Sequence, residues 1–362
     1  MTSLAPRCIL ILGKRWRRQL AEQKEHRDGK ECWVRAIDII ENQGRNMDAK
    51  QITSAGETIE RWPLLPYEAW KETLDTLHMW TQIVGKVRMK LSPHMNHWWH
   101  VTFYVTARGL TTSPIPYQGR TFEVDFDFID HNLFIHTSEG ASKAMSLIPR
   151  SVADFYREFM EALRSLNINV TINTLPCEVP NPIRCDEDFV HASYDPEYVN
   201  RFWRILVQMD SVFKAFRSQF IGKSSPVQFF WGSFDLAVTR FSGRRAPERP
   251  GADRMTRESF SHEESSCGFW PGDDSFPAPA FYSYTYPEPL GLKTASIRPA
   301  ATFYSTQIGE FLLRYDDMRS ADSPEQALLD FCQSTYEAGA NLAQWDREAL
   351  ERATSKISVS PI

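Results

Sequence analysis

Reactive side chains are concentrated around residue 262 of the 362-residue chain. His262 is followed directly by Glu263 and Glu264, and Cys267 comes a few positions later. A histidine with an ordinary pKa of about 6.5 serves as a general base or as a metal ligand near pH 7. A neighbouring carboxylate can orient the histidine or share a metal with it. We therefore predict His262 and Glu263 as acid–base groups or as ligands of a divalent metal. The spacing is not HExxH, so it does not indicate a zincin site, and Cys267 needs a neighbouring base to act as a nucleophile.

A second set of polar side chains is expected on one face of a strand at residues 99–108. Alternation places His100 and Arg108 on this polar face, and the next strand offers three carboxylates, Glu123, Asp125 and Asp127. One interpretation is a solvated sheet face, and the other is a polar cavity lined by His100, Arg108 and a carboxylate. We predict that a long loop over residues 242–278 folds across a cleft and points His262 at this face.

Other candidates lie among aromatic residues. Asp235 shares a strand face with Trp231, and a carboxylate in such surroundings needs a partner. An internal salt bridge, for example to Arg240, is one explanation for Asp235, and a place in the site is the other. The full set of predicted catalytic residues is His262, Glu263, His78, His100 and Asp235. The predicted binding residues are Gln82, Arg108, Arg240, Trp231, Trp270 and Tyr284.

Hydrophobic periodicity and capping residues define the elements that must position these side chains. Apolar residues at helical spacing and N-cap signals predict helices at residues 67–91, 151–166, 196–221 and 323–342. Alternating or apolar runs predict strands at residues 99–108, 121–129, 133–137, 168–175, 227–241, 280–286, 300–305 and 310–315. The pattern predicts an α+β fold with mostly antiparallel sheet. The order of helix, about three strands and helix occurs twice, so we also predict a tandem pseudo-repeat related by a pseudo-two-fold axis.

Composition excludes several classes of protein. With 42% hydrophobic and 24% charged residues, the chain is neither a disordered tail nor a coiled coil. A net charge of −5 gives no electrostatic case for nucleic acid. No apolar run approaches the roughly 18–20 residues that a membrane span needs. The six scattered cysteines form no CxxC pair, which favours a reducing, intracellular setting. Neither GxGxxG nor GxxxxGK[ST] occurs, so no nucleotide cofactor is expected.

The first 61 residues differ in charge from the rest of the chain. They contain twelve Lys or Arg and nine Asp or Glu, and no acidic residue precedes Glu22. A basic, acid-poor start is typical of a mitochondrial transit peptide. The alternative, which we favour because Ser and Thr are sparse, is a leader outside the fold of a cytoplasmic protein, with Met47 as another start. We predict a leader at 1–61, one unit at 62–350 with halves 62–180 and 181–350, and a tail at 351–362.

Several long motifs in the same order resemble a family. They are residues 78–86 (HMWTQIVGK), 96–101 (NHWWHV), 104–114 (YVTARGLTTSP), 126–131 (FDFIDH), 191–195 (HASYD), 230–235 (FWGSFD) and 265–272 (SSCGFWPG). This part of the chain resembles a bacterial family of uncharacterised proteins, a domain of unknown function. The resemblance spans about residues 62–350 and implies one unit rather than two independent domains. It implies no reaction, cofactor or catalytic residue.

The sequence therefore predicts an enzyme that acts on a small polar or anionic molecule through histidine and carboxylate groups, with or without a divalent metal. In this hypothesis Arg108 and Arg240 hold the anion, and Trp231, Trp270 and Tyr284 form the walls of the pocket. The alternatives are a non-catalytic protein that binds a small ligand in the same pocket and, third, a scaffold whose aromatic surface docks a partner protein.

Overall fold

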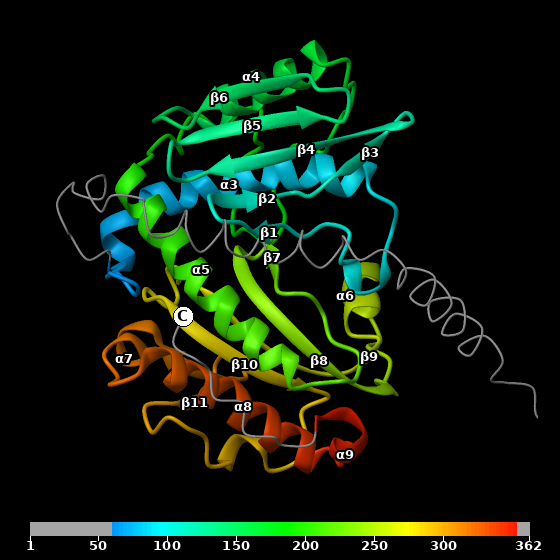
Figure 1. Ribbon diagram of the computed structural model, residues 1–362, viewed down its shortest axis with the longest axis vertical. Coiled ribbons are helices and arrows are strands. Elements are labelled where there is room, and N and C mark those ends of the chain that lie inside the picture. The colour runs from blue at the N-terminus through cyan, green and yellow to red at the C-terminus, as the bar shows by residue number, and fades with distance from the viewer. Residues whose placement is uncertain (1–59, 353–362) are drawn as a thin grey trace, which may run out of the picture. The chain divides into compact units, whose positions relative to one another are not determined.

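A computed structural model describes residues 60–352 of the chain. The predictions for the leader and the tail therefore lie almost entirely outside the described residues. The described part is an α+β structure with two six-stranded sheets whose pairings are all antiparallel, as the sequence predicted (Figure 1). No helix in this part is both long and apolar enough to cross a bilayer.

The first half begins with the long helix α3 (Tyr67–Leu91), whose end leads into a single 3-10 turn, η2 (Asn96–Trp98). The first sheet follows in the order β1-β2-β4-β5-β6, with β3 paired to β4. Its strands are β1 (Tyr104–Val105), β2 (Gly109–Thr111), β3 (Ile115–Tyr117), β4 (Arg120–Asp127), β5 (Asn132–Thr137) and β6 (Ser142–Ser146). Helix α4 (Val152–Ser165) closes this half and packs against α3.

The second half begins with helix α5 (Pro196–Ser218), and its sheet has the order β11-β12-β10-β9-β8-β7. The strands are β7 (Gln228–Phe230), β8 (Asp235–Arg245), β9 (His262–Trp270), β10 (Ala280–Tyr286), β11 (Phe303–Ser305) and β12 (Glu310–Arg314). The helical elements within and after the sheet are α6 (Arg254–Ser259), η3 (Leu292–Thr294), α7 (Tyr315–Arg319), α8 (Pro324–Leu342) and α9 (Arg347–Leu350).

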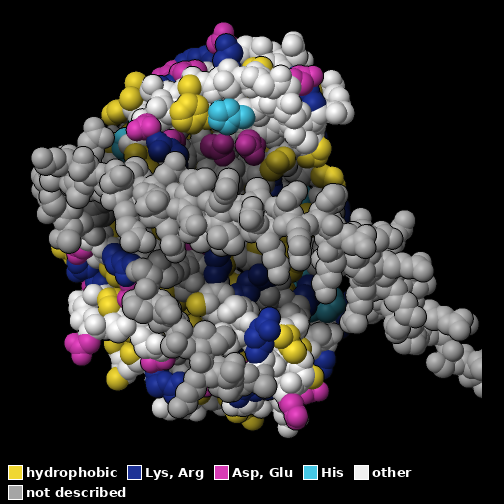
Figure 2. Space-filling view, in the orientation of Figure 1, with side chains coloured by type: hydrophobic (Ala, Val, Ile, Leu, Met, Phe, Trp, Pro, Cys, Tyr) yellow, Lys and Arg dark blue, Asp and Glu magenta, His cyan; other side chains and the backbone are white. Residues whose placement is uncertain are grey.

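Helices α5 and α8 cover one face of the second sheet and leave the opposite face for the site (Figure 1). Alternate residues of β8 and β9, such as Val238, Cys267 and Phe269, are buried toward these helices. On the molecular face in Figure 2, acidic, basic and apolar side chains are all spread over the described surface.

The two sheets meet edge to edge at one pair of residues. The backbones of Phe103 and Phe229 exchange hydrogen bonds of 2.8 and 2.9 Å, so β1 and β7 lie side by side. One hydrophobic cluster runs through both halves, from Trp62 to Trp345. The order of helix, antiparallel sheet and helix occurs in each half. Superposition of the halves by a pseudo-two-fold axis stays a prediction.

Helix ends follow the local signals in the sequence. Helix α4 begins after Ser151, whose hydroxyl accepts a hydrogen bond from the Asp154 amide. Helix α5 begins after Asp195, whose carboxylate accepts from the amides of Glu197 and Tyr198. These side-chain bonds satisfy backbone donors that the first turn of a helix leaves free.

Several predicted elements were wrong. The loop at 242–278 is in fact the end of β8, helix α6 and strand β9, so Ser261 to Cys267 is mostly strand. The strand at 99–108 shrinks to Tyr104–Val105, and the segment at 168–175 contains no strand. The strand at 227–241 is interrupted by a turn over residues 231–234. Polar residues in β9 hid its alternation, since Ser and Glu occupy positions where buried strands usually carry apolar side chains.

Candidate functional site

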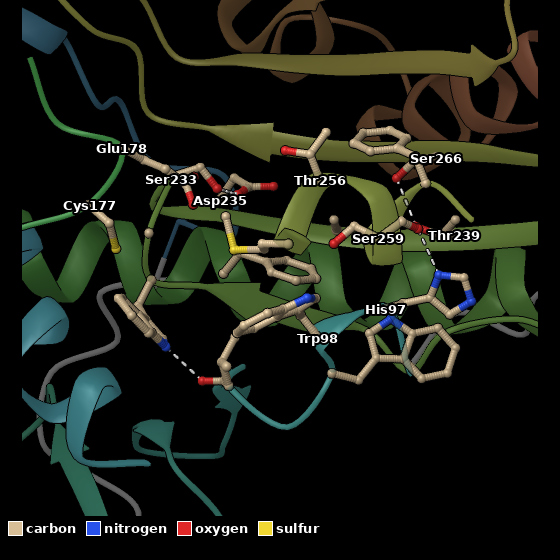
Figure 3. Close-up of a pocket in the computed structure, with 18 of the residues that line it drawn as sticks. His97, Trp98, Cys177, Glu178, Ser233, Asp235, Thr239, Thr256, Ser259 and Ser266 are labelled. Carbon is tan, nitrogen blue, oxygen red and sulfur yellow. Dashed lines mark hydrogen bonds between the residues drawn. The ribbon is translucent and has the colours of Figure 1, made fainter. Parts of the chain in front are cut away.

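A cavity of about 660 Å³ lies on the face of the second sheet that α5 and α8 do not cover (Figure 3). Its floor consists of alternate positions on three paired strands. Thr239, Ser266 and Tyr284 stand in register across β8, β9 and β10. The walls come from η2, from α6 with the residue before it, from the turn at 231–234 and from Cys177 and Glu178.

Two carboxyl groups lie together at one end of the cavity (Figure 3). Asp235 is 7% exposed and accepts hydrogen bonds from the hydroxyls of Ser233 and Tyr282. Glu178 lies against Gly232, where an added Cβ would come within 2.8 Å of Glu178 Oε1. Ser233 donates its hydroxyl hydrogen to Asp235 and also lies close enough to Glu178 to lower the pKa of that carboxyl group slightly. The two acids and this serine therefore form one connected group.

Both carboxyl groups have a raised pKa. Burial is the main cause at Asp235, and the hydrogen bonds from Ser233 and Tyr282 only partly offset it. Burial is also the main cause at Glu178, and the negative charges of Asp235 and Asp253 raise its pKa further. Each acid thus holds a proton at a higher pH than an exposed carboxylate does.

Helix α3 holds the backbone that carries this pair. His78 Nε2 lies 2.8 Å from the carbonyl oxygen of Gly232. Gln82 donates from Nε2 to the carbonyl oxygen of Cys177 at 2.7 Å and accepts from the Cys177 amide at 3.2 Å. One helix therefore fixes both segments on which the carboxyl groups stand. Burial lowers the pKa of His78 to about 4, so this ring is neutral and has a positioning role.

A second polar group lies at the other end of the cavity (Figure 3). His97 Nδ1 donates to the carbonyl oxygen of Ser259 at 2.7 Å, so its Nε2 accepts from Lys223 Nζ at 2.6 Å. The Lys223 ammonium stands 4.6 Å from the ring centre of Phe241. Burial lowers the pKa of both His97 and Lys223.

Glu264 faces the same end of the cavity from strand β9. Its carboxyl group accepts a hydrogen bond of 3.1 Å from the hydroxyl of Tyr284, and its side chain is buried. Burial raises the pKa of Glu264 to about 8.

Of the residues predicted from the sequence, Asp235, Trp231 and Tyr284 line the cavity. Gln82 and His78 lie behind its wall, in the network described above.

Arg108 and Arg240, which were predicted to hold an anion, lie outside the cavity. Arg108 is half exposed and pairs with Asp127 at 2.6 Å and Asp130 at 2.5 Å. Arg240 points to the opposite face of the sheet, where its guanidinium stacks on Phe216 and donates to the carbonyl oxygen of that residue. Burial lowers the pKa of Arg240 to about 10.

The residues predicted around position 262 are also dispersed. His262 is the first residue of β9 and stands beside His97, with 5.6 Å between the ring centres, but it does not line the cavity. Glu263 turns the other way and pairs with Arg244 at 2.7 Å. Trp270 lies at the end of β9 against Phe276.

His100 and Cys267 stand apart from the cavity as well. His100 packs against His94 and Trp98, and burial lowers its pKa to about 4. Cys267 faces the helices α5 and α8. The structure therefore does not bring His262, His100 and Arg108 into one site. Among residues 60–352, no three His, Cys, Asp or Glu side chains are grouped so as to hold a metal ion.

Four residues of the site were not predicted from the sequence, namely Glu178, Ser233, Tyr282 and His97. Glu178 lies in a proline-rich connection without periodicity. Its backbone has a φ of 59°, which no pattern in the sequence predicts. Tyr282 could have been predicted, because it lies two positions before Tyr284 in β10 and therefore shares its strand face.

Comparison with known proteins gives the family but no function. No curated protein and no solved structure matches the chain. The sequence profile of a family of unknown function, DUF5996, matches residues 62–352, which is most of the chain and nearly all of its described part. The chain therefore belongs to the DUF5996 family.

Proposed function

We propose that the chain is an enzyme that performs general acid–base chemistry on a small polar organic molecule bound in the cavity. The observation that carries this proposal is the pair of carboxyl groups at the cavity wall, the buried Asp235 and the more exposed Glu178, with Ser233 beside both of them. A buried acid without a basic partner costs free energy of folding. Carboxyl groups in a cavity with raised pKa values are therefore candidates for a functional role.

Backbone strain supports the same assignment. Glu178 and Phe234 have φ values of 59° and 58°, in the left-handed region that non-glycine residues seldom adopt. The two residues belong to the segments that carry the two acids. Such strain costs on the order of 1–3 kcal/mol per residue, and it is commonly kept where it positions a functional group.

The surroundings give the two acids different roles. Asp235 accepts from two hydroxyl donors, which favour its ionised form, so Asp235 serves as the general base. Glu178 faces the negative charges of Asp235 and Asp253, which favour its protonated form, so Glu178 serves as the general acid. Ser233 lies between them and can pass a proton from one to the other.

The polar class of substrate fits this cavity better than the anionic class. Both arginines that were expected to hold an anion are engaged elsewhere.

We also place the reaction inside the cell, because Cys177, Cys185, Cys267 and Cys332 are free thiols in the described part.

The test is turnover of a defined mixture of small metabolites, followed by mass spectrometry. The expected result is time-dependent loss of one component with the wild-type protein, reduced at least a hundredfold by Asp235→Asn and by Glu178→Gln. The control is Glu161→Gln, which changes an exposed carboxylate on α4 and should leave turnover unchanged. Each variant is first shown to melt as the wild type does. Wild-type turnover in both carboxyl variants, no turnover of any component by the wild type, or binding of a component without turnover would contradict the proposal.

A further inference from the structure

The cavity is surrounded by aromatic rings. Trp98, Trp99 and Phe241 contribute rings at the end near His97, and Phe230, Trp231 and Tyr282 are further lining residues. The face of an aromatic ring carries partial negative charge and attracts cations, most strongly where water is excluded. This lining therefore favours a positively charged or neutral guest over an anion.

The charged side chains that line the cavity also favour a cation over an anion. Its acids are Glu178, Asp235, Asp253 and Glu264, and its basic residues are Lys86 and His97. Lys86 donates from Nζ to the carbonyl oxygen of Leu175 at 2.8 Å, and both ring nitrogens of His97 are engaged. Acids thus outnumber bases, and none of the ion pairs found in the described part joins Glu178 or Asp235 to a basic side chain.

Lys223 shows how this protein accommodates an ammonium group. Its Nζ stands 4.6 Å from the ring centre of Phe241 and 5.4 Å from that of Trp99, and the acid whose charge acts on it is Glu264. Aromatic faces with a nearby buried carboxyl group therefore already hold one cation at the His97 end. The end with Glu178 and Asp235 also combines aromatic lining with a buried carboxyl group, that of Asp235, and its lysine, Lys86, donates to the backbone of Leu175 and not to either acid.

We infer that the cavity binds an organic cation, a small molecule whose ammonium group lies against the aromatic lining beside Asp235 and Glu178. This inference rests on the proposed function for the location of the site, and it adds the chemical class of the substrate. The ammonium group would supply the countercharge that the two carboxyl groups lack in the folded chain.

Binding of an organic cation beside these acids should depend on pH. A bound cation stabilises the ionised form of the acid beside it, so binding should release protons and tighten as the pH rises. The groups around the pair are Asp253 before α6, Lys86 on α3, Tyr282 on β10 and Ser233, and the charge of Asp235 raises the pKa of Glu310 on β12. Of these, only Lys86 opposes the cation.

Three probes of nearly equal shape separate charge from size. Choline carries a quaternary ammonium group, 3,3-dimethylbutan-1-ol is its neutral carbon isostere, and 3,3-dimethylbutanoate is the corresponding anion. Saturation-transfer NMR on the full chain, at millimolar probe, measures binding of each. We expect choline to bind about tenfold or more tightly than the alcohol, with the anion weakest. Choline binding should also strengthen as the pH rises.

Two variants test whether the preference for choline over the alcohol depends on Asp235. Asp235→Asn should remove most of the preference for choline over the alcohol, and Glu161→Gln on the surface of α4 should keep it. Equal binding of choline and the alcohol, no choline binding, or a preference that survives Asp235→Asn would overturn the inference. These outcomes leave the proposed function standing, since its readout is turnover of the metabolite mixture. If the turnover test failed but the protein still preferred choline to the alcohol, the proposed function would be wrong and the cation site would remain.

Discussion

At the scale of single residues, position on the strand rather than residue type decides which acid belongs to the site. Glu263 and Glu264 are adjacent and identical in chemistry, but strand alternation sends them to opposite faces. Glu263 pairs with Arg244 near the surface, and Glu264 is buried against Tyr284 in the cavity. Burial raises the pKa of Glu264 to about 8.

We predict that Glu264→Gln stabilises the protein at alkaline pH. The folded state raises the pKa of Glu264 from 4.5 to about 8, so the folded chain binds one more proton than the unfolded chain between these values. The free energy of unfolding therefore falls as the pH rises across this window, and the glutamine variant lacks this loss. The variant should match the wild type near pH 4.5 and exceed it above pH 8 by on the order of 5 kcal/mol.

Urea denaturation at several pH values measures this difference. Glu161→Gln, at an exposed position, is the matched control and should show no comparable change with pH. A constant difference between Glu264→Gln and wild type from pH 4.5 to pH 9 would refute the assignment of a protonated, buried Glu264.

The sequence identifies those site residues whose type conflicts with their local pattern. Asp235 was found because a carboxylate in a run of aromatic residues is costly. Arg240 met the same criterion, but its strand face packs against the helices, and the sequence does not say which face of a strand looks into a cavity. Glu178 escaped because only the tertiary fold brings its irregular segment to Gly232.

At the scale of elements, helices were predicted well because their signals are local. Tyr67–Leu91 has the predicted bounds, and the caps at Ser151 and Asp195 act as expected. Strand β9 was missed because its partners β8 and β10 fix it through backbone pairing, which tolerates Ser and Glu at buried positions. The same division holds in the site: its helical support α3 and two strands of its floor, β8 and β10, were predicted, and the strand between them, β9, was not.

Close packing between α3 and the cavity wall leads to a second prediction. A Cβ at Gly85 would lie 2.3 Å from the ring of Trp231, and that ring is held by a 2.6 Å hydrogen bond from Nε1 to the carbonyl oxygen of Val101. Gly85→Ala gains about 1 kcal/mol of helix propensity but overpacks a rigid contact at a cost of about 1–3 kcal/mol. We expect a net loss of stability and weaker ligand binding.

A double-mutant cycle identifies the cause. In a Trp231→Phe background the ring is smaller, so Gly85→Ala should cost at least about 1 kcal/mol less than in the wild type. Chemical denaturation of the four proteins gives this coupling. Additive effects would show that the alanine disturbs the helix itself rather than its contact with the wall.

At the scale of the whole molecule, the described residues form a single packed unit. The hydrophobic cluster is continuous across both halves, and the halves also share specific contacts. Trp203 on α5 donates from Nε1 to the carbonyl oxygen of Thr106 at 3.1 Å, and Asn200 donates to that of Phe128 at 2.9 Å. The cavity itself takes its floor from the second half and walls from the first, so the site requires the whole unit.

The last prediction concerns the segment before this unit, which lies outside the described residues. Within residues 60–352 the continuous core begins at Trp62, and the family profile begins at the same residue. The first specific contact of the described chain is also close to this point, since Glu60 pairs with Arg319 at 2.7 Å. Because buried apolar surface provides most of the stability of a folded domain, residues 1–46 should contribute little to it.

We expect a chain that starts at Met47 to melt within a few degrees of the full chain, with the same choline preference. Calorimetry of the two proteins side by side measures this, and insolubility or a large drop in melting temperature after the deletion would show that the leader belongs to the fold.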